Sequence, residues 1–260
     1  MTTGNINDPK AKIALITGGG RGLGHNTALS LAGKGVDAII TYHSKQAEAD
    51  ATVTAIKALG RSAAALQLDT GATKTFPDFA TQLKTILKDN WGVAEFDYLV
   101  NNAGIGINRP FAETTEADFD RLMNVNLKGV YFLTQTLLPL IKDGGRIINL
   151  SSGLARFSLP GFSAYGATKG AIEVLTHYLA KELGPRRITA NTVAPGAIET
   201  DFGGGHVRDN AEANRQVASA TPLGRAGLPD DIGPMIASLL SDDNRWINGQ
   251  RIEVSGGIFV

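Results

Sequence analysis

The sequence predicts an α/β fold in which helices cover both faces of a doubly wound parallel sheet. Short apolar runs alternate with longer helical patterns from one end of the 260-residue chain to the other. The apolar runs lack strict alternation, which is typical of parallel strands that are covered on both faces. A repeated strand–helix order with right-handed crossovers produces a sheet of this kind.

Each element is assigned from its hydrophobic pattern, and about seven strands result. The expected strands are 13–16, 38–41, 63–68, 98–100, 146–150, 189–194 and 251–254. The expected helices are 26–34, 46–59, 74–88, 116–141 (two helices or one bent helix), 165–183 and 230–240. No linker or repeat divides the chain, so residues 1–260 are predicted to form a single domain, with 1–10 flexible.

Composition excludes several classes of function. The 25 basic and 25 acidic residues balance, which argues against nucleic-acid binding and against a polybasic membrane anchor. The absence of cysteine excludes disulfides and thiolate chemistry, and the four histidines have no metal-ligand spacing, so no metal is expected. No leader peptide and no apolar run of membrane-spanning length is present, which predicts a cytoplasmic protein.

A glycine-rich turn follows the first predicted strand. Residues 17–24 read TGGGRGLG and lead into a helix. Glycine permits positive φ and lets backbone N–H groups approach a pyrophosphate, and the helix N-terminus adds its own unpaired N–H groups. The spacing Gly18-x-x-x-Gly22-x-Gly24 is neither GxGxxG nor a P-loop. The turn indicates a bound dinucleotide, although a glycine turn without a ligand is the simpler alternative.

The end of the second predicted strand favours one form of that dinucleotide. A site for NAD usually places an acidic residue here to bind the ribose hydroxyls. No acid lies between this strand and Glu48; His43, Ser44 and Lys45 follow the strand instead, and Arg21 stands in the glycine turn. Cations and hydroxyl donors suit a ribose 2′-phosphate, so the sequence favours NADP(H) over NAD(H).

Tyr165 and Lys169 lie four residues apart in a predicted helix, so their side chains share one face. A nearby ammonium would lower the phenol pKa by about two to three units, or ~3–4 kcal/mol, and prepare it for proton exchange with a carbonyl or alcohol. Taken alone, the Tyr-x-x-x-Lys pattern is weak, because most such pairs decorate helix surfaces.

Further polar segments fall at the carboxyl edge of the sheet, where α/β proteins bind ligands. The fourth strand ends in Asn101-Asn-Ala-Gly104, the fifth in Asn149-Leu-Ser-Ser152, and Pro195-Gly196 follows the sixth. Asn126 interrupts a helical pattern, where asparagine is a poor helix former.

These motifs, in this order, resemble those of short-chain dehydrogenases/reductases over residues 11–257. The match includes the glycine motif, Asn-Asn-Ala-Gly, Tyr-x-x-x-Lys and the Pro-Gly-x-x-x-Thr segment that ends at Thr200. Ser152, rather than Ser151, has the family's distance to Tyr165. The chain departs from the family at residues 255–257, which read Ser-Gly-Gly where Asp-Gly-Gly is common.

The resemblance implies a Rossmann-like domain and a role for each matched residue. Tyr165 would be the general acid/base, Lys169 would lower its pKa and hold the nicotinamide ribose, Ser152 would polarise the substrate carbonyl, and Asn126 would anchor a water. The implied cofactor-binding residues are Gly18, Arg21, Gly22, Leu23, Gly24, His43, Ser44, Lys45, Asp69, Asn102, Ala103, Gly104, Tyr165, Lys169, Pro195, Gly196, Ile198 and Thr200.

The expected activity is NADPH-dependent reduction of a ketone, reversible as alcohol oxidation. Loops 153–162 and 105–108 and a mobile lid, 199–220, would surround a mainly apolar pocket for aliphatic or aryl ketones. Two alternatives stay open: an NAD(P)-dependent sugar or polyol dehydrogenase, and a dinucleotide-sensing protein without catalysis. The resemblance extends to 3-oxoacyl-carrier-protein reductases and glucose dehydrogenase-like members, and it implies a homotetramer.

Overall fold

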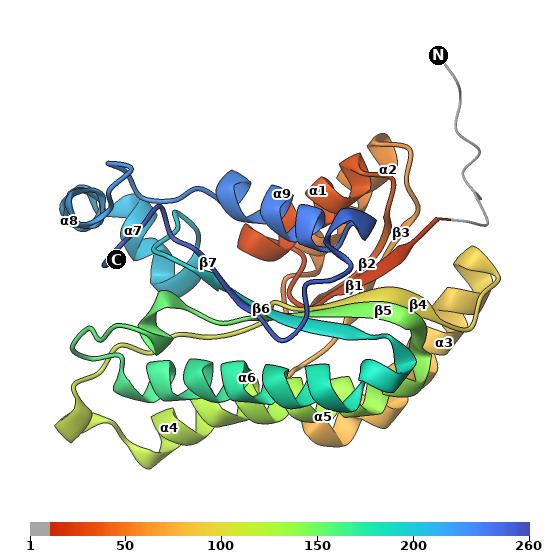
Figure 1. Cartoon of the computed structure of the whole chain (residues 1–260), viewed down its shortest axis with the longest axis horizontal. Coiled ribbons are helices and arrows are strands. Elements are labelled where there is room, and N and C mark those ends of the chain that lie inside the picture. The colour runs from red at the N-terminus through yellow and green to blue at the C-terminus, as the bar shows by residue number, and fades with distance from the viewer. Residues whose placement is uncertain (1–10) are drawn as a thin grey trace.

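The computed structural model describes residues 11–260, which form one seven-stranded parallel sheet between two layers of helices (Figure 1). The flexibility expected of residues 1–10 concerns a segment outside the described residues. The strands are β1 Ile13–Ile16, β2 Asp37–Tyr42, β3 Ala63–Gln67, β4 Phe96–Asn101, β5 Ile141–Leu150, β6 Thr189–Pro195 and β7 Arg251–Val254. The predicted fold class is confirmed.

The strand order is β3-β2-β1-β4-β5-β6-β7, with every neighbouring pair parallel. The chain moves outward from β1 to β3 and then returns to place β4 on the other side of β1. This reversal creates a crevice at the carboxyl ends of β1 and β4, the position at which doubly wound sheets bind ligands.

Two helical layers cover the sheet (Figure 1). One layer contains α1 Gly22–Gly33, α2 Gln46–Ala58 and α9 Pro229–Leu239; the other contains α3 Phe76–Trp91, α4 Glu116–Met123, α5 Gly129–Leu137 and α6 Ser163–Glu182. Two short helices, α7 His206–Asp209 and α8 Ala211–Ala220, lie beyond the carboxyl ends of the strands.

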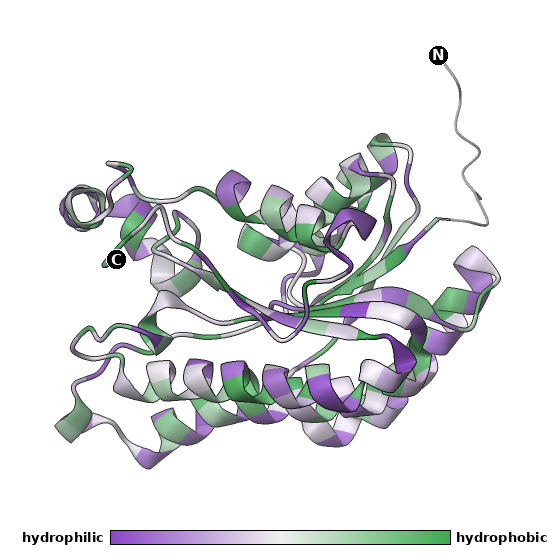
Figure 2. Ribbon diagram, in the orientation of Figure 1, coloured by the Kyte–Doolittle hydropathy of each residue, from purple (hydrophilic) through white to green (hydrophobic). Residues whose placement is uncertain are grey.

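The central strand shows how the two layers share the sheet. All four residues of β1 are buried, with Ala14 and Ile16 in the core beneath α1 and α9, and Ile13 and Leu15 in the opposite core. Because successive strand residues point to opposite faces, a continuous apolar run fills both cores. The covering helices carry hydrophobic and hydrophilic residues around their circumference, as Figure 2 shows.

The structure shifts several of the expected element boundaries. The helix expected over 116–141 consists of α4 and α5 joined by a π-helical turn, Asn124–Lys128, and the chain enters β5 at Ile141. The first helix begins at Gly22 instead of residue 26, so the last glycines of the turn belong to its first turn. Within residues 11–260, no helix combines the length and the apolar character needed to cross a membrane.

Candidate active site

The glycine turn is held open by backbone geometry that only glycine adopts easily. Gly18 and Gly22 have φ values of 65° and 54°, in the left-handed region. A Cβ on Gly24 would collide with the carbonyl oxygen of Gly18 and with the amide of Asn102. Gly24 therefore permits close packing of the turn and does not itself line the cleft.

The N-terminus of α1 opens from this turn. Arg21 precedes the helix in an extended conformation, and in the described part of the chain no side-chain hydrogen bond caps the helix. Its first N–H groups are consequently free to bind an anion. Asn102, from the end of β4, fixes the turn by donating its side-chain amide to the Thr17 carbonyl at 2.8 Å.

One continuous cleft of about 1520 Å³ runs along the carboxyl edge of the sheet. Its wall contains the glycine turn, the ends of β2, β4, β5 and β6, and the segment 196–220. Every residue proposed from the sequence lines this cleft except Gly24 and Asn126: Gly18, Arg21, Gly22, Leu23, His43, Ser44, Lys45, Asp69, Asn102, Ala103, Gly104, Ser152, Tyr165, Lys169, Pro195, Gly196, Ile198 and Thr200.

Tyr165 and Lys169 come together from consecutive turns of α6. Their side chains are 6% and 5% exposed, and the Lys169 Nζ lies 5.6 Å from the centre of the Tyr165 ring. The same Nζ donates a hydrogen bond of 2.8 Å to the Leu150 carbonyl at the end of β5. The pair is thus a fixed feature of the cleft floor, not a surface decoration.

Burial changes the acidity of both groups. It raises the pKa of Tyr165 to about 12, against a smaller opposing effect from the hydrogen bond with Ser152. It lowers the pKa of Lys169 to about 8. The lowered phenol pKa expected from the sequence is therefore not found in the protein alone, because the loss of water around the buried phenol disfavours the phenolate more than the hydrogen bond with Ser152 favours it.

The two consecutive serines have different surroundings. Both serines line the cleft, but Ser151 is buried and donates its hydroxyl to Glu173 Oε1 at 2.7 Å. Ser152 lines the cleft, and its hydroxyl hydrogen-bonds with Tyr165 and accepts from the Leu154 N–H at 3.2 Å. The geometry therefore associates Ser152, and not Ser151, with Tyr165.

Asn126 lies behind the cleft, in the π-helical turn between α4 and α5. It is 1% exposed, its Oδ1 accepts from the Ile105 N–H and its Nδ2 donates to the Ile105 carbonyl, each at 2.9 Å. Nδ2 also reaches the Thr168 hydroxyl at 3.3 Å. The Asn126 side chain thus braces the loop after β4 against the helix that carries Tyr165 and Lys169. The π-helical turn explains why an asparagine interrupts the helical pattern.

At the opposite end of the cleft, basic and acidic side chains lie close together. Arg21 Nη1 lies 3.7 Å from Asp201 Oδ2, and His43 Nε2 lies 3.7 Å from Asp69 Oδ2. Glu48 also lines this end, and its buried Oε2 has no hydrogen-bond partner among residues 11–260. The sequence predicted Asp69 at this end and no acid among the residues that directly follow β2; Asp201 and Glu48 are further acidic residues that the fold brings here.

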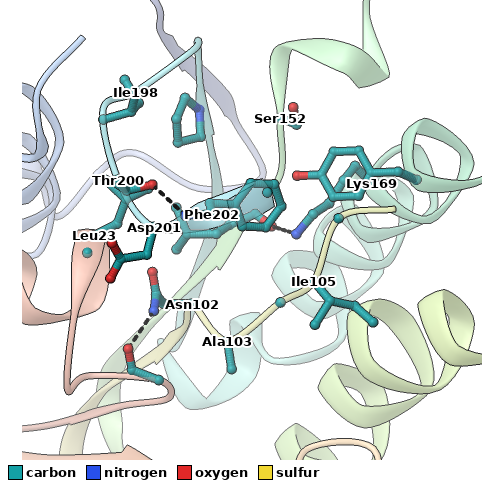
Figure 3. Close-up of a pocket in the computed structure, with 18 of the residues that line it drawn as sticks. Leu23, Asn102, Ala103, Ile105, Ser152, Lys169, Ile198, Thr200, Asp201 and Phe202 are labelled. Atoms are coloured by element: carbon teal, nitrogen blue, oxygen red, sulfur yellow. Dashed lines mark hydrogen bonds between the residues drawn. The ribbon is translucent and has the colours of Figure 1, made fainter. Parts of the chain in front are cut away.

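Aromatic rings surround the phenol. The ring centres of Phe162 and Phe202 lie 6.3 Å and 5.8 Å from that of Tyr165. Phe202 comes from the segment 199–220, and Figure 3 shows it lying between Thr200 and Lys169 in the cleft. A Cβ on Gly106 would meet the Phe202 ring at 2.7 Å, so the loop after β4 leaves space for this ring.

The segment 199–220 has a glycine-rich connection and buries few of its residues. Gly203, Gly204 and Gly205 all adopt left-handed φ values, and α8 buries none of its residues. Few buried contacts and a glycine-rich connection are the features of a segment with low local stability.

Asp201, Ile258 and Phe259 are among the cleft-lining residues that sequence reasoning did not single out. Asp201 carried no signal beyond its place next to Thr200. Ile258 and Phe259 are the third- and second-last residues of the chain, and no local pattern indicates that a chain end folds back over the sheet edge.

Fold and site together define an oxidoreductase of the dinucleotide-binding α/β class, in which a glycine turn and a buried tyrosine–lysine pair share one cleft. A family model described as enoyl-(acyl carrier protein) reductase matches residues 18–258. The chain belongs to the short-chain dehydrogenase/reductase family.

Individual relatives cover nearly the whole chain. A hydroxynaphthalene reductase-like protein of Metarhizium brunneum is 35% identical over 257 residues, which span 95% of this chain and 94% of the relative. The promiscuous reductase LugOII, described as catalysing keto-reduction at C1 during lugdunomycin biosynthesis, is 37% identical with a TM-score of 0.90 over 98% of this chain and 99% of LugOII.

A second solved structure was determined with a cofactor. The angucycline C-6 ketoreductase LanV, with bound NADP, is 34% identical, and its TM-score is 0.91 over 98% of this chain and 97% of LanV.

Proposed function

We propose that this protein is an NADPH-dependent reductase of aryl ketones, in which Tyr165 donates the proton. The observation that carries the proposal is the buried cluster of Tyr165, Lys169 and Ser152, which opens into the same cleft as the glycine turn. The NADP bound to LanV and the keto-reduction described for LugOII support the choice of cofactor and reaction.

The residues around the cleft fit a dinucleotide. Free N–H groups at the start of α1 and the Cβ-free surface of Gly18 would accept a pyrophosphate. Arg21, with His43, Ser44 and Lys45 at the end of β2, would bind a ribose 2′-phosphate, and Asn102 and Gly104 would lie beside the adenine ribose. When bound, the reduced cofactor supplies the hydride.

Side chains of the protein would then supply the proton that the carbonyl oxygen receives. A phenol with a pKa of about 12 is protonated at neutral pH, the form that can donate to a carbonyl oxygen gaining negative charge. Ser152 lies within hydrogen-bonding reach of the phenol and would donate to the same oxygen. Lys169 links α6 to the end of β5 through its hydrogen bond to the Leu150 carbonyl. Its ammonium would stabilise the phenolate that remains after the proton transfer.

Aromatic and aliphatic groups favour flat apolar substrates. Phe162 and Phe202 lie beside Tyr165, and Phe157 and Phe259, whose rings are in contact with each other, line the same cleft. Such walls suit fused aromatic rings and give no hydrogen-bond partners to a polyhydroxylated sugar. The names of the hydroxynaphthalene reductase-like relative and of the angucycline ketoreductase agree with this substrate class.

The assembly we propose is a homotetramer, in the cytoplasm. Exposed apolar side chains occur on two neighbouring helices of one face: Tyr131 and Phe132 on α5, and Val174 and Tyr178 on α6. Tyr131 and Tyr178 are 46% and 63% exposed, so this face offers apolar area to another copy of the chain.

A substrate screen tests the proposed function. Loss of NADPH absorbance is measured with cyclohexanone, α-tetralone and a linear sugar aldehyde, and each assay is repeated with NADH. The proposal expects turnover of α-tetralone with NADPH, and less with NADH or with the sugar. Absence of turnover with every carbonyl, together with tight NADPH binding, would favour the sensing alternative and reject the proposed reaction.

A further inference from the structure

The C-terminal segment 255–260 folds back into the substrate end of the cleft. Gly256 and Gly257 turn the chain with φ values of 61° and 85°, after β7. Ile258 is then buried, Phe259 is 45% exposed, and both residues line the same cleft as Tyr165. The last residues of the chain are therefore part of the wall.

Arg156 holds this segment in place. Its Nη1 donates to the Phe259 carbonyl at 2.8 Å and its Nη2 to the Ile258 carbonyl at 3.1 Å. The rings of Phe157 and Phe259 also meet edge to face, with their centres 4.7 Å apart. The loop that follows Ser152 and the chain end are thus joined by backbone hydrogen bonds and by an aromatic contact.

Glu253 orients the arginine. Arg156 donates Nε to Glu253 Oε2 at 2.8 Å and Nη2 to Glu253 Oε1 at 3.1 Å, a two-point pairing of guanidinium and carboxylate. Since the charge and the donors of Arg156 are engaged by Glu253 and by the two carbonyls, the side chain is poorly placed to bind an acidic substrate. This argues that it positions the wall instead.

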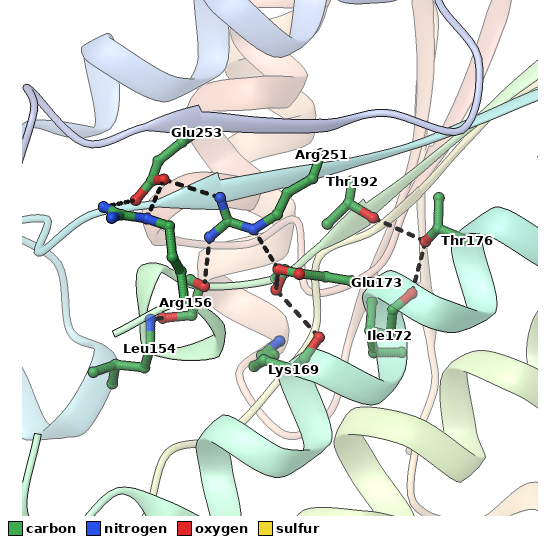
Figure 4. Close-up of polar contacts among 11 residues, drawn as sticks. Leu154, Arg156, Lys169, Ile172, Glu173, Thr176, Thr192, Arg251 and Glu253 are labelled. Atoms are coloured by element: carbon green, nitrogen blue, oxygen red, sulfur yellow. Dashed lines mark hydrogen bonds and ion pairs between the residues drawn. The ribbon is translucent and has the colours of Figure 1, made fainter. Parts of the chain in front are cut away.

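Further hydrogen bonds and ion pairs link Glu253 to α6, the helix that carries Tyr165 and Lys169 (Figure 4). Arg251 donates a hydrogen bond to Glu253 Oε2 at 2.9 Å and another to Glu173 Oε1 at 2.7 Å. Glu173 Oε1 also accepts a hydrogen bond from the Ser151 hydroxyl at 2.7 Å. A chain of charge-assisted hydrogen bonds therefore links α6 and the end of β5 to the chain terminus.

We infer that Arg156 and Glu253 are positioning residues that clamp Ile258 and Phe259 as a substrate-selecting wall of the cleft. The inference rests on the proposed ketone reductase activity and deepens it. With the clamp intact, the Phe259 ring limits the size of the ketone that reaches Tyr165. Without it, the wall moves aside, so a larger ketone gains access while a compact ketone loses an apolar contact.

The kinetic test compares α-tetralone with cyclohexanone in Arg156→Ala, Arg156→Lys and Phe259→Ala. In Arg156→Ala and Phe259→Ala, the ratio of kcat/KM for α-tetralone over cyclohexanone should rise roughly tenfold, mainly through KM. Arg156→Lys keeps the charge but not the paired donors, so it should give an intermediate ratio. Arg245→Ala removes an exposed arginine whose side chain, within residues 11–260, bonds to the Asp242 carbonyl, and it should keep the wild-type ratio.

A second measurement needs no substrate. Carboxypeptidase Y releases Val260 and then Phe259, and release should be roughly tenfold faster from Arg156→Ala than from wild type or Arg245→Ala, because the clamped end must open before cleavage. An unchanged release rate would overturn the clamp.

The two measurements separate the possible failures. Equal changes for both ketones, or none, would overturn the selecting role even if the clamp exists. Absence of turnover in the wild type would reject the proposed function and the selection that rests on it, while the carboxypeptidase rates would still decide whether Arg156 holds the chain end.

Discussion

Replacing Lys169 by methionine should change the pH dependence of folding stability. Burial lowers the pKa of Lys169 from 10.5 to about 8, which corresponds to about 3 kcal/mol of preference for the neutral amine in the folded protein. Below pH 8 the folded wild type must keep a buried ammonium, and it bears this full cost. Methionine fills a similar volume without a charge and removes the cost.

The number of protons bound at Lys169 in the folded and unfolded states determines how folding stability changes with pH. Between pH 8 and 10.5 the unfolded chain binds a proton at this lysine that the folded protein does not, so wild-type stability rises with pH. Lys169→Met lacks this rise. The variant's stability relative to wild type should therefore fall by about 3 kcal/mol between pH 7 and 10.5. The lost bond to the Leu150 carbonyl lowers the variant's stability at every pH and leaves the slope unchanged.

Urea unfolding measures this difference at several pH values and one protein concentration. The fluorescence of Trp91 and Trp246 reports the transition. Lys84→Met, which removes an exposed lysine from α3, is the matched control for the loss of one positive charge. A stability difference that stays constant from pH 7 to 10.5 would refute the reasoning, because it would mean that Lys169 titrates alike in the folded and unfolded states.

Three further predictions concern the cofactor end and the reaction. Gly24→Ala should abolish NADPH binding, measured by calorimetry, while Gly33→Ala, whose Cβ meets nothing within 4 Å, should bind normally. Arg21→Ala should raise the KM for NADPH roughly tenfold or more and leave the KM for NADH nearly unchanged; equal effects on both would contradict a 2′-phosphate contact. For ketone reduction, kcat/KM should decline above about pH 8, where the free enzyme loses the Lys169 charge, and Lys169→Met should lack that inflection.

Much of the fold was predictable because its determinants are local. Apolar runs gave β1 to β7 in order, and β1 shows why, since its four residues are buried on both faces. The glycine turn was equally readable, because left-handed φ at Gly18 and Gly22 leaves a direct mark on the sequence. Asn126 was noticed for its poor helix propensity, and the structure gives the reason, a π-helical turn.

The rest depends on contacts between distant segments. The electrostatic environment of Tyr165 was misjudged because adjacency to Lys169 is visible in sequence, whereas the burial that raises the phenol pKa to about 12 is not. The same holds for Phe259, which lines the cleft with its carbonyl bonded to Arg156, a residue 103 positions earlier in the chain. Long-range packing of this kind leaves no periodic pattern.

Tyr165→Phe tests the central claim most directly. The variant keeps the aromatic ring between Phe162 and Phe202 and removes only the hydroxyl. NADPH affinity, measured by calorimetry, should stay near the wild-type value, while kcat for α-tetralone reduction should fall roughly 100- to 10,000-fold. Turnover close to that of wild type, with the same cofactor affinity, would contradict proton donation by Tyr165.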